Sequence, residues 1–314
     1  MGMGLHRLTG ITIGVPDVAT TAAYYTEFGL TPTATREGDQ VARFSTQDGG
    51  EQLRLKRTDL RRLLDIGVGA DDSDDLGRVA SCLQRLDLGF ERTETGVTAV
   101  DPGTGVKVHV SIAPRVEPEP AQQQSYNAPG RPVRTNARAE GVTREGPVKP
   151  RKLGHVVLGS TNYAASERFF IAGIGFKVSD LVSDVAAFIR CSTDHHNVLI
   201  QQAPVSFLHH TSWIVDDIDE IGRGAHNMLT ADPSRHVWGL GRHAVGSNFF
   251  WYLKDPAGNF SEYSSDIDCI VDDALWKPQV WEGARALYEW GPPPPPSFLA
   301  PDDLAELMTC AHTS

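Results

Sequence analysis

Histidine has the most informative distribution of any residue type along this chain. The sequence contains 11 histidines, and eight of them fall between His155 and His243. Two of these, His155 and His210, lie in apolar, strand-like runs, and Glu262 lies in the last such run. Two neutral imidazoles and one carboxylate on adjacent strands form a facial triad, the ligand set of non-haem Fe(II) oxygenases. The pattern therefore predicts a mononuclear metal site.

These residues lie in the second of two similar segments. Residues 8–28 and 153–175 each begin with an alternating apolar strand and continue into an amphipathic helix that ends near a glycine. The two segments also close alike, because residues 97–110 and 249–263 each contain a strand, an Asp-Pro turn and a second strand. Two tandem copies of one α+β unit are therefore expected.

Comparison of the two copies distinguishes the metal-site residues from the shared scaffold. Aligning the first strands and the Asp-Pro turns places each of the three opposite a residue of a different type: His155 opposite Gly10, Glu262 opposite Val108, and His210 opposite Asp65 or Ile66. A role in the scaffold does not require this asymmetry, whereas a metal site in one copy does. The first copy is therefore expected to bind no metal.

Length and local composition predict how the chain is divided. At roughly 100–200 residues per domain, two domains are expected. A connector rich in Pro, Gln, Arg and Glu separates them and is predicted to be extended. The predicted division is residues 1–112 for the first domain, 113–151 for the connector, 152–268 for the metal-binding domain and 269–314 for a tail that packs on it.

Composition also limits the partners. The net charge of −11 argues against nucleic acid. No apolar run approaches the roughly 18 residues that span a bilayer, and the N-terminus lacks a signal-peptide pattern, so no membrane contact and a cytoplasmic location are expected. Four scattered cysteines without C-x-x-C spacing argue against a disulfide framework or a thiolate zinc site.

Four motifs in the second half carry a resemblance to a known family. They are Leu-Gly-His155, Asp-His-His196-Asn, Leu-His-His210-Thr, and the stretch from Gly241-Arg-His243 through Tyr252-Leu-Lys-Asp-Pro-Ala-Gly to Glu262-Tyr. With them, the chain resembles the type I extradiol ring-cleavage dioxygenases of the vicinal oxygen chelate superfamily. One departure is Trp251, where the family has an aliphatic residue or Phe.

The resemblance implies an α+β fold of two tandem domains, each with paired βαβββ modules that form an open barrel around a cavity. It implies a substituted catechol as substrate, O2 as co-substrate, Fe(II) as cofactor with Mn(II) as the alternative metal, and a homo-oligomer. The implied residue roles are as follows: His155, His210 and Glu262 as metal ligands, His196 as the acid–base group, and His243 and Tyr252 as hydrogen-bond partners of the bound catecholate and oxygen.

The remaining expectations concern the pocket. Val157, Phe188, His209 and Val245 are predicted to form its walls, and their apolar character favours an aryl- or alkyl-substituted catechol. By strand alternation, His195 and His209 should point away from the faces used by His196 and His210. Two alternatives keep the same fold: a Lewis-acid metalloenzyme of the glyoxalase type, or a metal-free protein that binds a small molecule.

Overall fold

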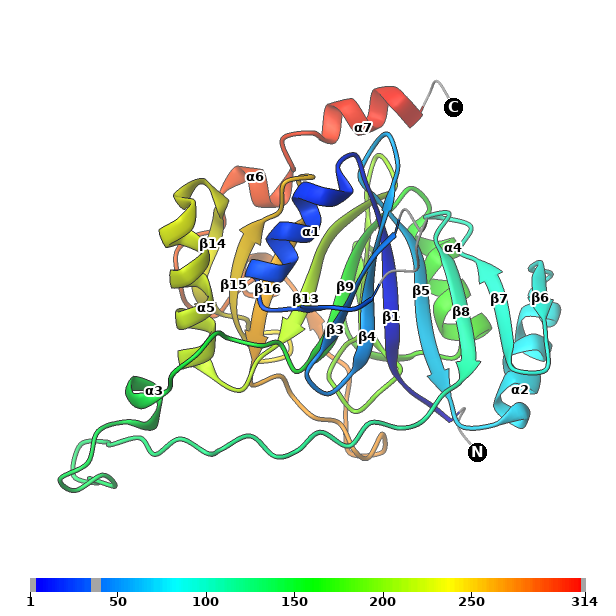
Figure 1. Cartoon of the computed structure of the whole chain (residues 1–314). Helices are drawn as coiled ribbons and strands as arrows, with labels where there is room; N and C mark the ends of the chain where they lie inside the picture. The colour runs from blue at the N-terminus through cyan, green and yellow to red at the C-terminus, as the bar shows by residue number, and fades with distance from the viewer. Residues whose placement is uncertain (1–3, 35–40, 312–314) are drawn as a thin grey trace.

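The computed structural model describes residues 4–34 and 41–311, which form two large mixed sheets with helices packed around them (Figure 1). The first sheet has the strand order β2-β3-β4-β1-β5-β8-β7-β6, and the second has the order β14-β15-β16-β13-β9-β12-β11-β10-β17. Each sheet joins two βαβββ units through one central antiparallel pair, β1 with β5 and β9 with β13. The predicted duplicated α+β fold is confirmed.

The strands of the first sheet are β1 (Leu5–Val15), β2 (Thr31–Pro32), β3 (Val41–Thr46), β4 (Gly50–Arg57), β5 (Arg62–Ala70), β6 (Phe90–Arg92), β7 (Gly96–Val100) and β8 (Lys107–Ile112). Those of the second are β9 (Lys152–Ser160), β10 (Lys177–Val182), β11 (Ala186–Arg190), β12 (Val198–Gln202), β13 (Phe207–Ile214), β14 (His236–Arg242), β15 (Phe249–Lys254), β16 (Phe260–Ser265) and β17 (Val280–Trp281).

Four of the α-helices begin at a polar side chain that caps them. Asp17, Asp72, Asn162 and Asp217 each accept a hydrogen bond from an amide of the first turn of the helix that follows. The helical segments are α1 (Val18–Glu27), α2 (Ser73–Arg85), α3 (Glu140–Thr143), α4 (Tyr163–Arg168), η1 (Phe169–Ile174), α5 (Ile218–Ala231), η2 (Pro233–Arg235), η3 (Gly283–Ala286), α6 (Pro296–Leu299) and α7 (Leu304–Ala311). Each of these helices is too short or too polar to cross a membrane.

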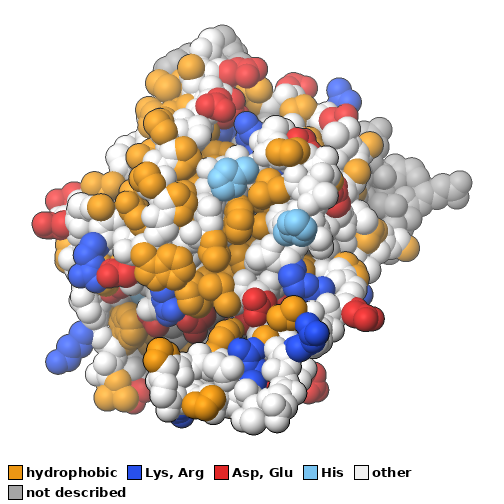
Figure 2. All heavy atoms as spheres, turned by 90° about the vertical axis from the view of Figure 1, so that its left-hand side faces the viewer, with side chains coloured by type: hydrophobic (Ala, Val, Ile, Leu, Met, Phe, Trp, Pro, Cys, Tyr) orange, Lys and Arg blue, Asp and Glu red, His pale blue; other side chains and the backbone are white. Residues whose placement is uncertain are grey.

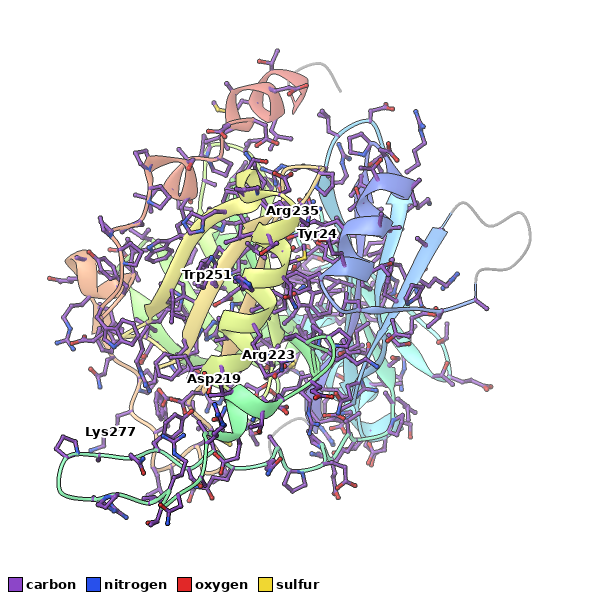
Figure 3. The ribbon with its side chains drawn as sticks, turned by 60° about the vertical axis from the view of Figure 1, so that its left-hand side comes forward. Tyr24, Asp219, Arg223, Arg235, Trp251 and Lys277 are labelled. Atoms are coloured by element: carbon purple, nitrogen blue, oxygen red, sulfur yellow. The ribbon has the colours of Figure 1, made fainter. Side chains whose placement is uncertain are left out.

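Helix α1 of the first half packs against strand β16 of the second half. The Phe28 ring stacks on Tyr263 with centroids 3.9 Å apart, and the Tyr263 hydroxyl donates to the Phe28 carbonyl at 2.7 Å. Nearby, the Arg235 guanidinium lies over the Tyr24 ring, 5.5 Å from its centroid (Figure 3). Because β16 also carries Glu262, the first half holds a strand of the predicted metal site in place.

The connector and the C-terminal segment run over the outside of the two sheets. In Figure 1 the connector follows the lower edge of the molecule and carries α3 on a projecting loop. It is tied to α5 by Arg144, which pairs with Asp217 at 2.6 Å and with Glu220 at 3.2 Å. The predicted domain boundaries themselves stay a prediction.

The Asp-Pro turns of the two copies differ in length, and this corrects one alignment made from the sequence. The amide of Asp101 bonds to a carbonyl five residues on, whereas the amide of Asp255 bonds to one four residues on. The first turn thus holds one extra residue, and every later position shifts by one. His109, and not Val108, therefore lies opposite Glu262.

The strand register identifies the residue of the first copy that corresponds to His210. Asp65 pairs with the residue two before His109, and His210 pairs with the residue two before Glu262, so Asp65 is the counterpart of His210 and Ile66 is not. Asp65 Oδ1 lies 3.1 Å from His109 Nε2. The first copy therefore keeps two polar side chains at these positions.

Candidate metal centre and active site

Three neighbouring strands bring the predicted triad together. His155 comes from β9, His210 from β13 and Glu262 from β16, and all three side chains are buried. The Nε2 atoms of the two histidines are 3.3 Å apart. Glu262 Oε2 lies 3.1 Å from His155 Nε2 and 3.7 Å from His210 Nε2. Three donor atoms thus converge on one point.

The triad fits a metal ion. Donors held about 2.1 Å from one ion at right angles to each other lie about 3 Å apart, close to the three distances above. Glu262 Oε2 is buried without a hydrogen-bond partner, and a bound cation would satisfy it. Within the part of the chain that the structure describes, this is the one group of three or more His, Cys, Asp or Glu side chains placed to hold a metal.

His209 orients the ring of His210, one of the predicted metal ligands. The Nδ1 atoms of the two rings are 2.7 Å apart, and His209 Nε2 lies 2.6 Å from the carbonyl oxygen of Phe298. Because a carbonyl only accepts, His209 donates from Nε2, and its Nδ1 accepts the Nδ1–H of His210. His210 Nε2 is then left with its lone pair toward the metal position, an arrangement typical of metal-binding histidines.

Burial keeps these two rings neutral, which metal binding requires. Burial lowers the pKa of His209 to about 4, and burial together with the adjacent His209 lowers the pKa of His210 well below its usual value. At neutral pH each ring is therefore an unprotonated imidazole, the form that coordinates metals.

The expectation that His209 points away from the site is wrong, whereas His195 is not among the described residues that line the cavity. The pairing of β13 with β9 contains an irregularity between Leu208 and His210, so strand alternation is interrupted at His209, which contacts the same cavity as His210. His195 lies in the loop between β11 and β12, where alternation does not apply, and its Nδ1 is 3.1 Å from the Nδ1 of His196.

Asn248 is a residue of the site that the sequence analysis missed. Its Nδ2 donates to Glu262 Oε1 at 3.2 Å and to Ser264 Oγ at 3.0 Å, and it is completely buried. One oxygen of Glu262 is therefore held by an amide while the other faces the two histidines. No spacing rule marks this residue, because it lies in a turn before β15.

His196 lies beside the triad in a fixed loop. Its ring is 4.2 Å from that of His155 and 5.2 Å from that of Phe188, measured between centroids. The adjacent Asn197 holds the loop, since its Nδ2 donates to the Gly154 carbonyl at 3.1 Å on the strand that carries His155. Burial lowers the pKa of His196 well below its usual value, so the ring is neutral.

His243 and Tyr252 form a pair beside the other two triad residues, His210 and Glu262. His243 Nε2 lies 2.9 Å from the Tyr252 hydroxyl oxygen, and His243 Nδ1 bonds to the carbonyl of Leu287. His243 therefore donates from Nδ1 and accepts the Tyr252 hydroxyl at Nε2. Burial, and then the nearby charge of Glu262, raises the pKa of Tyr252 well above its usual value, so this phenol is protonated.

These residues surround a cavity of about 110 Å³. All four predicted wall residues line it: Val157, Phe188, His209 and Val245. The sequence analysis missed the contribution of the C-terminal segment, which adds Ala286, Leu287, Phe298 and Leu299 to the wall. On the face that looks left in Figure 1, hydrophobic side chains gather in a central hollow (Figure 2).

Comparison with known proteins shows which family this site belongs to. Residues 152–263 match the Glyoxalase/Bleomycin resistance protein/Dioxygenase superfamily. The chain is 32% identical over 304 residues to metapyrocatechase 2 of Cupriavidus necator, covering 94% of this chain and 92% of that protein. The chain belongs to the extradiol catechol dioxygenases of this superfamily. The predicted family and enzyme class are confirmed.

Two solved structures of similar fold each cover more than nine tenths of this chain. The Mn(II)-bound glyoxalase from Novosphingobium aromaticivorans is 26% identical, with a TM-score of 0.73 and 93% of each chain covered. Homoprotocatechuate 2,3-dioxygenase from Arthrobacter globiformis is 17% identical, with a TM-score of 0.74, covering 96% of this chain and 92% of that one. At 17% identity, the likeness to homoprotocatechuate 2,3-dioxygenase concerns the fold alone.

The names of two further relatives include different metals. A manganese-dependent 2,3-dihydroxybiphenyl 1,2-dioxygenase of Geobacillus genomosp. 3 is 24% identical, covering 43% of this dioxygenase and 45% of that protein. An iron-dependent extradiol dioxygenase of Rhodococcus jostii is 28% identical, covering 44% and 50%. The relatives thus include one enzyme named for manganese and one named for iron.

Proposed function

We propose that this dioxygenase opens the ring of a substituted catechol beside its two hydroxyls, with Fe(II) held by His155, His210 and Glu262. The carbon–carbon bond next to the diol breaks, and both atoms of O2 enter the ring-opened product. The observation that carries the proposal is the convergence of two imidazole nitrogens and one carboxylate oxygen, 3.1–3.7 Å apart, in an apolar cavity. This is the facial set typical of non-haem Fe(II) oxygenases. The same donors accept Mn(II).

The bound metal would supply a site where the diol and O2 meet and exchange charge. The protein groups around it handle protons. Tyr252 donates to His243, so its hydroxyl oxygen is free to accept a hydrogen bond from the remaining hydroxyl of a catechol that binds as its monoanion. In this proposal His196, a neutral base beside the triad, takes up a proton at Nε2 and returns it when the oxygen–oxygen bond breaks.

The wall of the cavity supports an uncharged, alkyl- or aryl-substituted catechol. Apolar side chains predominate in it, and no Lys or Arg is among the described residues that line it. A catechol with a carboxylate substituent would therefore be buried there without a cationic partner, which is costly. Among the described lining residues, Gln201 has the one amide side chain.

A second candidate is non-redox Lewis-acid catalysis at the same triad, favoured by the likeness to the Mn(II)-bound glyoxalase. Such a reaction consumes no O2. The group formed by His196, His243 and Tyr252 supports the dioxygenase instead, because it provides two proton-handling sites beside different members of the triad.

The test uses protein loaded with Fe(II) without air, then given a catechol and exposed to O2. We expect one O2 to be consumed per ring opened, with a yellow product, for alkyl- and aryl-catechols and far less for carboxylated ones. A metal-loaded protein that consumes no O2 with any catechol would contradict the proposal. Loading with Mn(II) in parallel compares the two metals. The cytoplasmic location and the homo-oligomeric state stay predictions.

A further inference from the structure

A buried chain of three side chains leads away from the triad. Asp180 on β10 lies with its Oδ2 3.2 Å from His195 Nε2, and His195 Nδ1 lies 3.1 Å from His196 Nδ1. Each of the three side chains is at most 4% exposed. His195 is outside the metal triad, and its ring packs edge-on against Trp276 with centroids 5.3 Å apart. The proposed function gives it no part.

The C-terminal segment fixes the far end of this chain. Asp180 Oδ1 accepts the amide of Gln279 at 2.7 Å, and Oδ2 accepts the indole N–H of Trp281 at 2.9 Å. Both donors lie in or beside β17, which adds to the sheet next to β10. A backbone amide and an indole N–H can only donate, and they reach both oxygens of Asp180, so its carboxylate acts as an acceptor toward His195 as well.

The direction of each hydrogen bond follows from that fact. The carboxylate of Asp180 accepts the Nε2–H of His195, so the Nδ1 of neutral His195 carries a lone pair. That lone pair accepts the Nδ1–H of His196, which leaves His196 Nε2 unprotonated. His209 and His210 show the same arrangement, with the Phe298 carbonyl as the final acceptor.

We propose that Asp180 and His195 are positioning residues that fix the ring orientation and the tautomer of His196, so that its Nε2 is available to take a proton from the bound substrate. The inference rests on the proposed function, because it assigns a partner to the acid–base group named there. It extends the site to β10 and β17, which do not otherwise reach the triad.

Two different substitutions at His195 distinguish the positioning role from a role in packing alone. His195→Phe keeps a ring of similar size but removes the Nδ1 acceptor. His195→Asn loses the ring, yet its Oδ1 is the same number of bonds from the backbone as Nδ1 and can accept the Nδ1–H of His196. We expect His195→Phe to lower kcat by about 10–100-fold, the range seen for partners of metal-site histidines. KM for the catechol and metal content should change little, and His195→Asn should recover most of kcat.

A double substitution tests the dependence on His196. In a His196→Phe background, adding His195→Phe should cost no further activity, since the ring it positions is gone. If His196→Phe alone is fully active, the acid–base role in the proposed function is wrong. If His196→Phe is impaired and His195→Phe is not, the positioning role is wrong.

A spectroscopic readout is independent of turnover. In the full-length protein without metal, ¹⁵N shifts of the His196 imidazole should show Nδ1 protonated and Nε2 unprotonated. His195→Phe should convert this to a mixture of tautomers or to the opposite one, and His195→Asn should keep it. An unchanged tautomer in His195→Phe would overturn the inference.

Discussion

At the scale of single residues, this site depends on pairs of histidines that are adjacent in sequence. In each pair the first ring is bonded to a fixed acceptor, the Asp180 carboxylate for His195 and the Phe298 carbonyl for His209. The second ring must then present a bare Nε2 to the cavity. In our proposal, the same local chemistry thus produces a metal ligand at His210 and a proton acceptor at His196.

His196→Phe tests the second of these roles. The variant should keep its metal and its affinity for catechol, because His196 is beside the triad and not part of it. Turnover should fall by about 10²–10⁴-fold, the usual contribution of a positioned acid–base group. Metal analysis, anaerobic catechol titration and steady-state O2 uptake measure the three quantities. A variant that turns over at the normal rate would exclude His196 as the acid–base group.

Tyr252→Phe tests the proposed role of the Tyr252 hydroxyl in binding the catechol. The ring is buried and stacks on Trp238 with centroids 5.7 Å apart, so removal of the hydroxyl alone leaves the packing in place. We expect an unchanged melting temperature and metal content, together with weaker catechol binding or slower turnover. Normal kinetics would mean that Tyr252 serves only the core, and Tyr252→Ala would then mainly destabilise the fold by a few kcal/mol, about 3–5.

At the scale of elements, the C-terminal segment fixes residues of the site by hydrogen bonds. Three of its groups bond directly to residues around the cavity: the Leu287 carbonyl to His243, the Phe298 carbonyl to His209, and the Trp281 indole to Asp180. The sequence shows an aromatic tail, which predicts packing. It cannot show these contacts, because two of the three use backbone carbonyls that no residue type reveals.

Two shortened chains test the role of α6. A chain that ends after Pro295 loses the Phe298 carbonyl, so His209 is no longer oriented, and metal affinity should fall by about 10–100-fold. A chain that ends after Asp303 loses α7 but keeps both that carbonyl and the carboxylate that pairs with Arg61, so its metal affinity should stay close to that of the full chain. Competition with a chelator measures both. Equal affinities in the two chains would contradict the role assigned to α6.

At the scale of the whole molecule, the first half acts as a support for the second. Tyr25 on α1 and Phe28 at its C-terminal end contact the neighbours of Glu262 on β16, since Ser261 donates to the Tyr25 hydroxyl at 3.2 Å and Phe28 stacks on Tyr263. Arg61 adds a second tie, with a guanidinium nitrogen 2.6 Å from the Leu208 carbonyl just before the histidine pair. The first half therefore contributes to the site without supplying a ligand.

Phe28→Ala tests this support. Its ring is fully buried, and the loss should destabilise the fold by about 3–5 kcal/mol and also weaken metal retention, because β16 loses its stacking partner. Leu76→Ala on α2 is the control, since it opens a cavity in the same half away from β16. Comparable losses of stability with unchanged metal retention in both variants would show that α1 does not support the site.

How much the sequence could predict follows from which interactions leave a local pattern. The strand periods and the repeated Asp-Pro turns predicted the duplicated fold, and the residue types with the family motifs predicted the triad. The alternation rule failed at His209 because an irregularity in β13 interrupts it. The copy alignment failed at Val108 because one extra turn residue shifts the register. Asn248 and the tail contacts arise only from tertiary packing.

The metal content of the two copies tests the central claim most directly. Protein loaded with Fe(II) should hold about one ion per chain by elemental analysis, bound by a facial triad in the second half alone. Glu262→Ala should lose most of it, whereas His109→Ala, at the matching position of the first copy, should keep it. Undiminished iron in Glu262→Ala, or its loss in His109→Ala, would contradict the account.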